Sequence, residues 1–244
     1  MRWYRELRRI GRADYGIDAP EGLRNITLGG FGALAAGVLL SRRGRSRASI
    51  VALVVGVFSI VCAVLWLAST KIGKRFERDR LFDSLALRGD ERVLDAGCGR
   101  GLMLLGAAQR LTSGHAVGID PWMKDQSGNS PTATLANATA VGVRDRVTAM
   151  TGDVRWLPFR DGAFDVAVSN LVLDNIHDSE GWTQAMRELA RVLQPGGRIL
   201  VSDLANTEQY EATLREEGWT DVERSGPHFR VFPPVRVVTG SKPS

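Results

Sequence analysis

Two long uncharged stretches stand near the start of the chain, at residues 25–41 and 48–68. The second is long enough for a helix to cross the ~30 Å hydrocarbon layer of a bilayer, and the first reaches the lower limit of about 17 residues. Gly29, Ala33 and Gly37 recur every four residues in the first stretch, a spacing that lets two membrane helices approach closely. We therefore expect a membrane helical hairpin within a basic N-terminal segment that covers residues 1–70.

Short apolar runs of alternating strand and helix length follow from residue 91 to the end of the chain. This alternation is typical of a parallel, doubly wound α/β sheet with helices on both faces. The last two strands have no helix between them, so they can pair antiparallel. The expected strands cover residues 92–96, 116–120, 146–151, 164–169, 197–203, 220–225 and 234–240, and the expected helices cover residues 102–111, 130–141, 179–193 and 206–217.

Residues 71–90 connect the two parts of the chain. Their apolar positions, Ile72, Phe76, Leu81, Phe82 and Leu85, stand among charged residues. This pattern predicts an amphipathic linker helix that leaves the bilayer and packs beside a ligand entrance.

The run from Val93 to Gly101, VLDAGCGRG, indicates an apolar strand that enters a glycine turn and opens a helix. Glycines, which lack a Cβ, let the main chain approach a ligand closely. The spacing is Gly-x-Gly-x-Gly rather than the Gly-x-Gly-x-x-Gly of dinucleotide sites, and Asp95, two residues before the first glycine, would repel a pyrophosphate. From Asp95 to Gly101 the run resembles the first motif of the class I S-adenosylmethionine-dependent methyltransferases, whose cofactor carries an ammonium and a sulfonium cation.

Four further segments resemble the same family in the expected order. Asp120 ends the second strand, where a carboxylate can accept both ribose hydroxyls of the cofactor. In the family, the position of Asp153 binds the adenine amino group and that of Val154 covers the adenine ring. The strand from Phe164 and the turn at residues 195–197 complete the pattern. The resemblance implies a seven-stranded Rossmann-like sheet and S-adenosyl-L-methionine bound by Asp95, Gly97, Cys98, Gly99, Gly101, Asp120, Pro121, Asp153, Val154 and Asn170.

Residues 170–178 follow the fourth strand and should border the methyl group. Methyl transfer is an in-line displacement, so positioning and exclusion of water contribute most of the rate. Histidine titrates near neutral pH, which makes His177 the candidate general base, with Asp174 or Asp178 to orient it. A surface or helix-capping role for His177 is the alternative. The segment lacks the Asn/Asp-Pro-Pro-aromatic signature of the enzymes that methylate amino groups of DNA and glutamine, so those substrates are not expected.

Composition removes several other functions. The two cysteines and three histidines show no metal-ligand spacing, and the cysteine triplet that radical chemistry on S-adenosylmethionine requires is absent. The net charge of +5 is concentrated near the apolar stretches, which favours anionic lipid headgroups over nucleic acid as the partner.

The positive charges also bear on topology. S-adenosylmethionine is made in the cytosol, so an active domain at residues 91–244 has to face the cytoplasm. A spanning hairpin then puts the four arginines of residues 42–47 outside, against the usual preference, but eleven basic residues flank the hairpin on the inside. A hairpin that dips into the bilayer and returns would keep every arginine in the cytoplasm and is the alternative. The eleven are Arg2, Arg5, Arg8, Arg9, Arg12, Arg24, Lys71, Lys74, Arg75, Arg78 and Arg80.

Three functions fit these patterns. The first is an integral membrane methyltransferase with a cytoplasmic catalytic domain and a small, lipophilic acceptor. The second is a methyltransferase for a protein or a soluble substrate, in which the hairpin sets only the location. The third is a non-catalytic membrane protein that binds S-adenosylmethionine. The acceptor and the oligomeric state are left open by the sequence.

Overall fold

The protein is described here by a computed structural model that covers residues 13–123, 126–176 and 178–244. Seven strands form one sheet in the order β3-β2-β1-β4-β5-β7-β6. β1 to β5 are parallel, and β7 runs antiparallel to both β5 and β6. This arrangement confirms the doubly wound seven-stranded fold with an antiparallel last pair. The strands are β1 (Arg92–Ala96), β2 (His115–Asp120), β3 (Val147–Thr151), β4 (Phe164–Asn170), β5 (Leu193–Asp203), β6 (Thr220–Arg224) and β7 (Arg236–Ser241).

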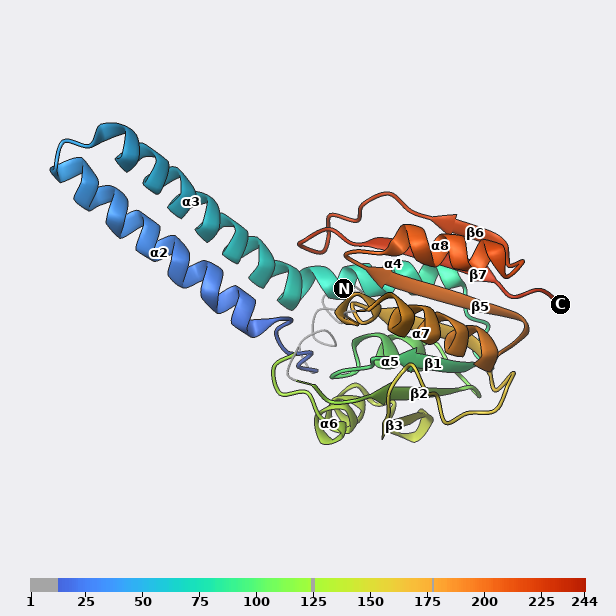
Figure 1. The fold of residues 1–244 in the computed structure, drawn as a ribbon. Helices are drawn as coiled ribbons and strands as arrows, with labels where there is room; N and C mark the ends of the chain where they lie inside the picture. Colours follow the sequence, from blue (N-terminus) through green and yellow to red (C-terminus); the bar gives the residue numbers. More distant parts are fainter. Residues whose placement is uncertain (1–12, 124–125, 177) are drawn as a thin grey trace.

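Helices cover both faces of the sheet (Figure 1). The helices are α4 (Lys74–Leu85), α5 (Leu102–Ala108), α6 (Pro131–Val141), α7 (Ser179–Val192) and α8 (Thr207–Glu216), with short turns η1 (Ser69–Gly73), η2 (Arg144–Arg146) and η3 (Leu173–Asn175). Along β1, neighbouring residues point to opposite faces: Val93 packs with α4 and α5 on one side, and Leu94 packs with α7 and α8 on the other.

The turn expected at residues 195–197 is part of β5 instead. β5 pairs with β4 through Leu193 opposite Phe164 and again from Arg198 opposite Val166, with a register shift between these pairs. The Pro195-Gly196-Gly197 sequence is therefore accommodated as an irregularity inside a long strand, which glycine and proline commonly mark.

Two antiparallel helices, α2 (Pro20–Arg42) and α3 (Ser46–Ala68), form a stem that projects from the domain (Figure 1). Their backbones approach at Gly30, Gly37 and Gly56, where an added Cβ would collide with residues of the opposite helix. The Ser49 hydroxyl donates to the Gly37 carbonyl at 2.8 Å. The small-residue contact was thus expected correctly at Gly37 and wrongly at Gly29, which meets no neighbouring atom within 4 Å.

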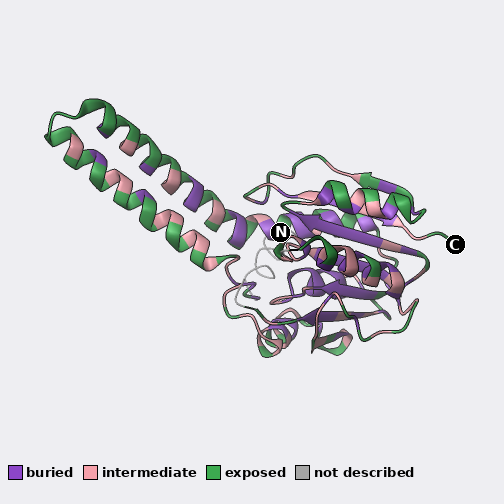
Figure 2. Ribbon diagram, in the orientation of Figure 1, coloured by how far each residue is buried: buried purple, intermediate pink, exposed green. Residues whose placement is uncertain are grey.

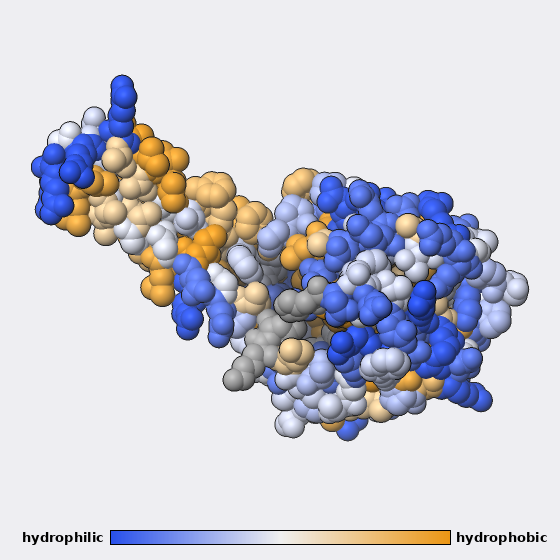
Figure 3. All heavy atoms as spheres, in the orientation of Figure 1, coloured by the Kyte–Doolittle hydropathy of each residue, from blue (hydrophilic) through white to orange (hydrophobic). Residues whose placement is uncertain are grey.

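The stem is apolar and largely exposed (Figures 2 and 3). Only 11% of the most apolar part of α2 and 17% of that of the helix beginning at Ser46 are buried, whereas a core helix of a water-soluble protein buries most of its apolar side chains. The loop at the far tip is hydrophilic (Figure 3). Both helices are long and apolar enough to cross a membrane.

The linker expected at residues 71–90 is helical from Lys74 to Leu85 as α4, and its buried face differs from the expected one. α3 continues through the π-helical turn η1 into α4. Leu81, Phe82 and Leu85 are buried as expected, but Ile72 and Phe76 are exposed. Their places against the domain are taken by charged side chains with internal partners, namely Lys74, Glu77 and Arg78.

Candidate active site

A cavity of about 470 Å³ opens at the carboxyl ends of β1, β2 and β4. In parallel α/β sheets this edge is where ligands bind. All the cofactor-binding candidates from the sequence line the cavity except Gly101, which precedes α5 with a positive φ of 88°. The lining candidates are Asp95, Gly97, Cys98, Gly99, Asp120, Pro121, Asp153, Val154 and Asn170.

The glycine turn is held by the end of β2. The amides of Gly97 and Cys98 donate to the Ile119 carbonyl at 2.8 and 3.1 Å, and the Gly99 amide donates to Asp120 Oδ2 at 2.8 Å. Gly97 has a φ of +80°, and a Cβ at this position would overlap the side chain of Val172. Glycine is therefore required at position 97 both by its backbone angles and by the closeness of the chain that follows β4.

Asp95 lies beneath the turn and is 1% exposed. Its Oδ2 accepts a hydrogen bond from the Leu104 amide at 2.7 Å, so the carboxyl group also fixes the first turn of α5. Burial, with a further contribution from the nearby Asp120 carboxylate, raises the pKa of Asp95 to about 8. A cation bound beside Asp95 would favour its ionised form.

Asp174 and Asp203 form a carboxyl pair at the cavity. Asp174 lies in η3 and lines the cavity, and Asp203 ends β5 and is fully buried. Asp174 Oδ1 and Asp203 Oδ2 are buried and have no hydrogen-bond partner among the described residues. Burial raises the pKa of both carboxyl groups. Only Asp174 lines the cavity, so it is the member of the pair that can exchange a proton with a bound molecule.

The catalytic candidate His177 lies outside the described residues. Of the two acids expected to orient it, Asp178 caps α7 by accepting a hydrogen bond from the Gly181 amide. Asp174 is paired with Asp203 instead. Asp203 was not expected at the site, because neither the glycine-turn motif nor the strand pattern marks the acid that ends β5.

The base of the stem forms one wall of the cavity. Asp18 and Ala19 precede α2, Trp66 is near the end of α3, and Ser69 and Thr70 belong to η1. Lys74, only 5% exposed, also lines this wall and donates to both Asp18 carboxylate oxygens at 2.9 and 3.0 Å. Residues 231–233 complete the wall, and the Phe232 amide donates to the Ser69 hydroxyl at 2.8 Å.

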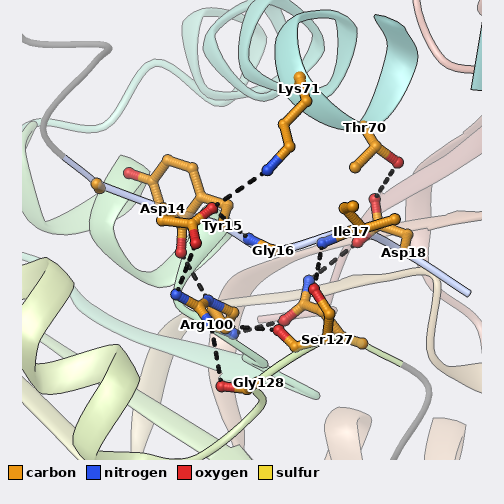
Figure 4. Close-up of polar contacts among 12 residues, drawn as sticks. Asp14, Tyr15, Gly16, Ile17, Asp18, Thr70, Lys71, Arg100, Ser127 and Gly128 are labelled. Atoms are coloured by element: carbon orange, nitrogen blue, oxygen red, sulfur yellow. Dashed lines mark hydrogen bonds and ion pairs between the residues drawn. The ribbon is translucent and has the colours of Figure 1, made fainter. Parts of the chain in front are cut away.

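The segment before α2 runs across the glycine turn (Figure 4). Arg100 donates to the Asp14 carbonyl at 2.6 Å and to its carboxylate at 3.1 Å, and also to the carbonyls of Ser127 and Gly128. Ile17 and Ser127 are joined by two hydrogen bonds, at 2.8 and 3.0 Å. The polar loop after β2 therefore fastens the N-terminal segment over the turn.

Comparison with known proteins agrees with this geometry. Residues 94–201 match the family model described as a methyltransferase domain. The chain is 32% identical over 134 residues to a sterol 4-C-methyltransferase of Caenorhabditis elegans, covering 55% of this chain and 37% of the relative. It is 30% identical over 138 residues to a demethylmenaquinone methyltransferase of Lactiplantibacillus plantarum, covering 55% and 54%. The chain thus spans between a third and about half of the length of these two relatives.

A solved structure shows the same fold. Phosphoethanolamine N-methyltransferase 2 of Haemonchus contortus, in complex with S-adenosyl-L-methionine, aligns with a TM-score of 0.57 at 16% identity, covering 69% of this chain and 52% of that one. Residues 94–201 are therefore similar to the methyltransferase domain family, and the domain has the fold of a protein that binds S-adenosyl-L-methionine. S-adenosylmethionine is the cofactor that this similarity supports.

The residues around Asp120 fit the ribose of S-adenosylmethionine. Asp120 Oδ1 accepts from the Trp122 amide and from Asn129 Nδ2, and Oδ2 accepts from Gly99. A carboxylate offers about four acceptor positions, so one remains for a ribose hydroxyl. Asn129 Oδ1, which belongs to another cavity residue, is buried and has no donor among the described residues. This oxygen can accept from the second hydroxyl.

Asp153 is less available to an adenine amino group. Arg155 holds both of its carboxylate oxygens, through Nε at 3.0 and 3.1 Å and through Nη2. This ion pair lowers the pKa of Asp153 below its usual range. An adenine amino group would have to share a carboxylate that already has a strong cationic partner.

Proposed function

We propose that the protein is a membrane-anchored methyltransferase that moves a methyl group from S-adenosylmethionine to a lipophilic small molecule. The observation that carries the proposal is the shared wall: the base of an exposed apolar stem lines the same cavity as the glycine turn. A molecule dissolved in the bilayer that followed the stem would meet the cavity without crossing the aqueous face of the domain.

The names of two relatives support this acceptor class. One acts on a sterol and the other on demethylmenaquinone, and sterols and quinones are apolar molecules that partition into membranes. Apolar side chains also line the cavity, Val172, Ile176 and Phe232 among them. These side chains would exclude water from the reacting atoms.

In the proposed reaction, S-adenosylmethionine supplies an electrophilic methyl group, and the electrons of the broken carbon–sulfur bond remain on the sulfur. Asp174 accepts the proton of the acceptor at its carboxylate as the acceptor attacks the methyl carbon. Asp203 is a positioning residue, because its fully buried carboxyl group accepts a hydrogen bond from the Val172 amide at 3.0 Å and so holds the segment that leads to Asp174. His177 remains a second candidate base, and His177→Ala tests it separately.

The stem supports a spanning hairpin over a dipping one. Each helix has 23 residues, and at 1.5 Å per residue each is about 35 Å long, enough to cross a ~30 Å hydrocarbon layer. The tip holds the four arginines of residues 42–47. Six basic residues in the described part of the chain lie at the domain end, namely Arg24, Lys71, Lys74, Arg75, Arg78 and Arg80. The catalytic domain would then face the cytoplasm, where the cofactor is made.

The function is tested by incubating the purified full chain in vesicles with radiolabelled S-adenosylmethionine and separate lipid, small-molecule and protein extracts. We expect label in the lipid extract, and less label with Asp120→Ala at a cofactor concentration close to the wild-type Kd, because this variant should bind the cofactor more weakly. Label in protein or in soluble small molecules alone would replace the lipophilic acceptor. Cofactor binding with no labelled product from any extract would favour a non-catalytic role.

Anchoring is tested separately from catalysis. The full chain should resist extraction from membranes by alkaline carbonate. A cysteine placed at Ser46 should react with an impermeant reagent in intact cells if the hairpin spans. Labelling only after lysis would favour the dipping hairpin, and release of the protein by carbonate would exclude anchoring.

A further inference from the structure

Three large apolar side chains are exposed on the domain just beyond the stem. Phe229 is 79% exposed, Ile72 is 58% exposed and Phe76 is 51% exposed. Ile72 and Phe76 are four residues apart on one helical stretch, so they share a face. Leaving three such side chains in water is unfavourable by roughly 25 cal/mol per Å² of apolar surface.

The two segments that carry these side chains lie side by side. The Arg230 carbonyl packs against Gly73, where a Cβ would collide with it. His228 Nδ1 contacts Glu77 Oε1, and Arg230 Nη1 lies 3.9 Å from Glu77 Oε2. Glu77 is 2% exposed, so this buried carboxylate fixes residues 228–230 along the start of α4. The three apolar side chains therefore belong to one fixed surface.

Two basic side chains lie beside the same surface. Arg80 is 52% exposed and Arg230 is 56% exposed, measured on their side chains, and both approach Glu77. Apolar side chains flanked by exposed cations are typical of a protein surface that lies in the headgroup layer of an anionic membrane. We call Ile72, Phe76, Phe229, Arg80 and Arg230 the interfacial patch.

The height of Ile72 agrees with that layer, and Phe76 lies one helical turn beyond it. Ile72 is four residues and Phe76 eight residues beyond Ala68, the last residue of α3, which is about 6 and 12 Å along the helix axis. The headgroup region adds about 5–8 Å on each side of the hydrocarbon core, and tilt of the helix, about 20° on average, brings one side of the domain closer. The patch begins where the apolar stem ends.

We propose that the interfacial patch lies in the headgroup layer of an anionic phospholipid bilayer and seats the catalytic domain against it. The proposal rests on the proposed anchoring of the stem. Phe229 is followed within the same segment by Val231, Phe232 and Pro233, which line the cavity. One short segment thus contacts the lipid at one end and the cavity at the other, and it marks where an acceptor would enter.

The test uses the full chain in vesicles of equal parts phosphatidylcholine and phosphatidylglycerol. A polarity-sensitive fluorophore is attached to Phe229→Cys, and its quenching by lipids that carry a headgroup nitroxide is measured. Ser113→Cys is the matched control, because Ser113 is exposed and precedes β2, so it lies at the amino ends of the parallel strands, opposite the cavity. Cys62 and Cys98 are buried, and the labelled parent chain gives their background.

We expect strong quenching at position 229, none at position 113, and less quenching at 229 in vesicles of phosphatidylcholine alone. Equal quenching at the two positions would overturn the proposal. Flotation of the same vesicles separates it from the anchoring of the stem. A chain that floats with an unquenched label at 229 refutes the seating and leaves the anchor standing, and a chain that does not float refutes both.

Discussion

Replacing Asp120 by alanine removes a carboxylate that accepts several hydrogen bonds within the proposed cofactor site. Asp120 is 6% exposed and accepts from the Gly99 amide at 2.8 Å, the Trp122 amide at 2.6 Å and Asn129 Nδ2 at 3.2 Å. Alanine leaves the two backbone amides without this partner, while Asn129 Nδ2 keeps its hydrogen bond to the Met123 carbonyl at 3.3 Å. The change therefore acts on the glycine turn, on the loop after β2 and on the ribose position together.

The magnitude follows from these bonds. An unpaired buried donor costs about 1–3 kcal/mol, but water entering from the cavity can satisfy part of the deficit, so we expect a loss of about 2–4 kcal/mol in the free energy of unfolding. Losing a charge-assisted bond to the ribose should weaken cofactor binding by a further ~1–3 kcal/mol, or about 5- to 150-fold in Kd. Asp153→Ala is the control. Because Arg155 already holds the Asp153 carboxylate, its removal should weaken binding by less than about fivefold.

The assay is calorimetric titration of the detergent-solubilised full chain with S-adenosylhomocysteine, with thermal unfolding measured on the same samples. Asp120→Asn adds a check of the reasoning, because its amide presents a donor to a site where three donors already converge and should not restore binding. Wild-type affinity in Asp120→Ala, or a larger loss in Asp153→Ala than in Asp120→Ala, would refute the assignment of the β2 carboxylate to the cofactor.

Three further predictions follow from the site. Gly99→Ala should keep the fold, because its Cβ would meet only the end of the Gln126 side chain, and it should weaken S-adenosylhomocysteine binding. Gly97→Ala should lower the unfolding temperature more, because its Cβ would overlap Val172. The opposite order of the two unfolding temperatures would contradict this. Burial raises the pKa of Asp95 to about 8, so above pH ~4 the folded state retains a proton that the unfolded state has lost. The contribution of Asp95 to stability therefore falls as pH rises from about 4 to 8. Over this range the unfolding temperature should fall less steeply in Asp95→Asn than in the wild type, and parallel curves would count against this. With the labelled acceptor, Asp174→Asn should lower turnover by about 100-fold or more at unchanged cofactor affinity. The wild-type rate should fall on acidification at a higher pH than an ordinary aspartate would give, and Asp203→Asn should shift this pH profile. An unshifted profile would remove the positioning role of Asp203.

The sheet was predictable because its signals are local. Most of its strands begin and end within three residues of the expected positions, since alternating apolar runs are bounded by glycines and helix caps. Ser130, for example, caps α6 by accepting from the Ala133 amide, and Gly142 ends that helix with a positive φ. β5 was the exception, because a register shift against β4 depends on the partner strand.

Other features of the site were not predictable because they join distant parts of the chain. The pair of Lys74 with Asp18 spans 56 residues, and the Asp174–Asp203 pair depends on where two strand ends meet. Neither leaves a periodic trace in the sequence. The exposure of Ile72 and Phe76 had the same cause, because internal partners for Lys74 and Glu77 decided which face of α4 is buried.

These long-range contacts bear on why the stem is attached where it is. A hairpin that serves only as a tether needs no more than a solvated linker to the domain. Here both ends of the hairpin lie at the cavity. Asp18 lies just before α2 and η1 directly follows α3. Lys74 and Thr70 contact the same Asp18 carboxylate. A change in the tilt of the stem would therefore move a wall of the cavity. If the stem is anchored as proposed, the bilayer would also influence the shape of the acceptor entrance.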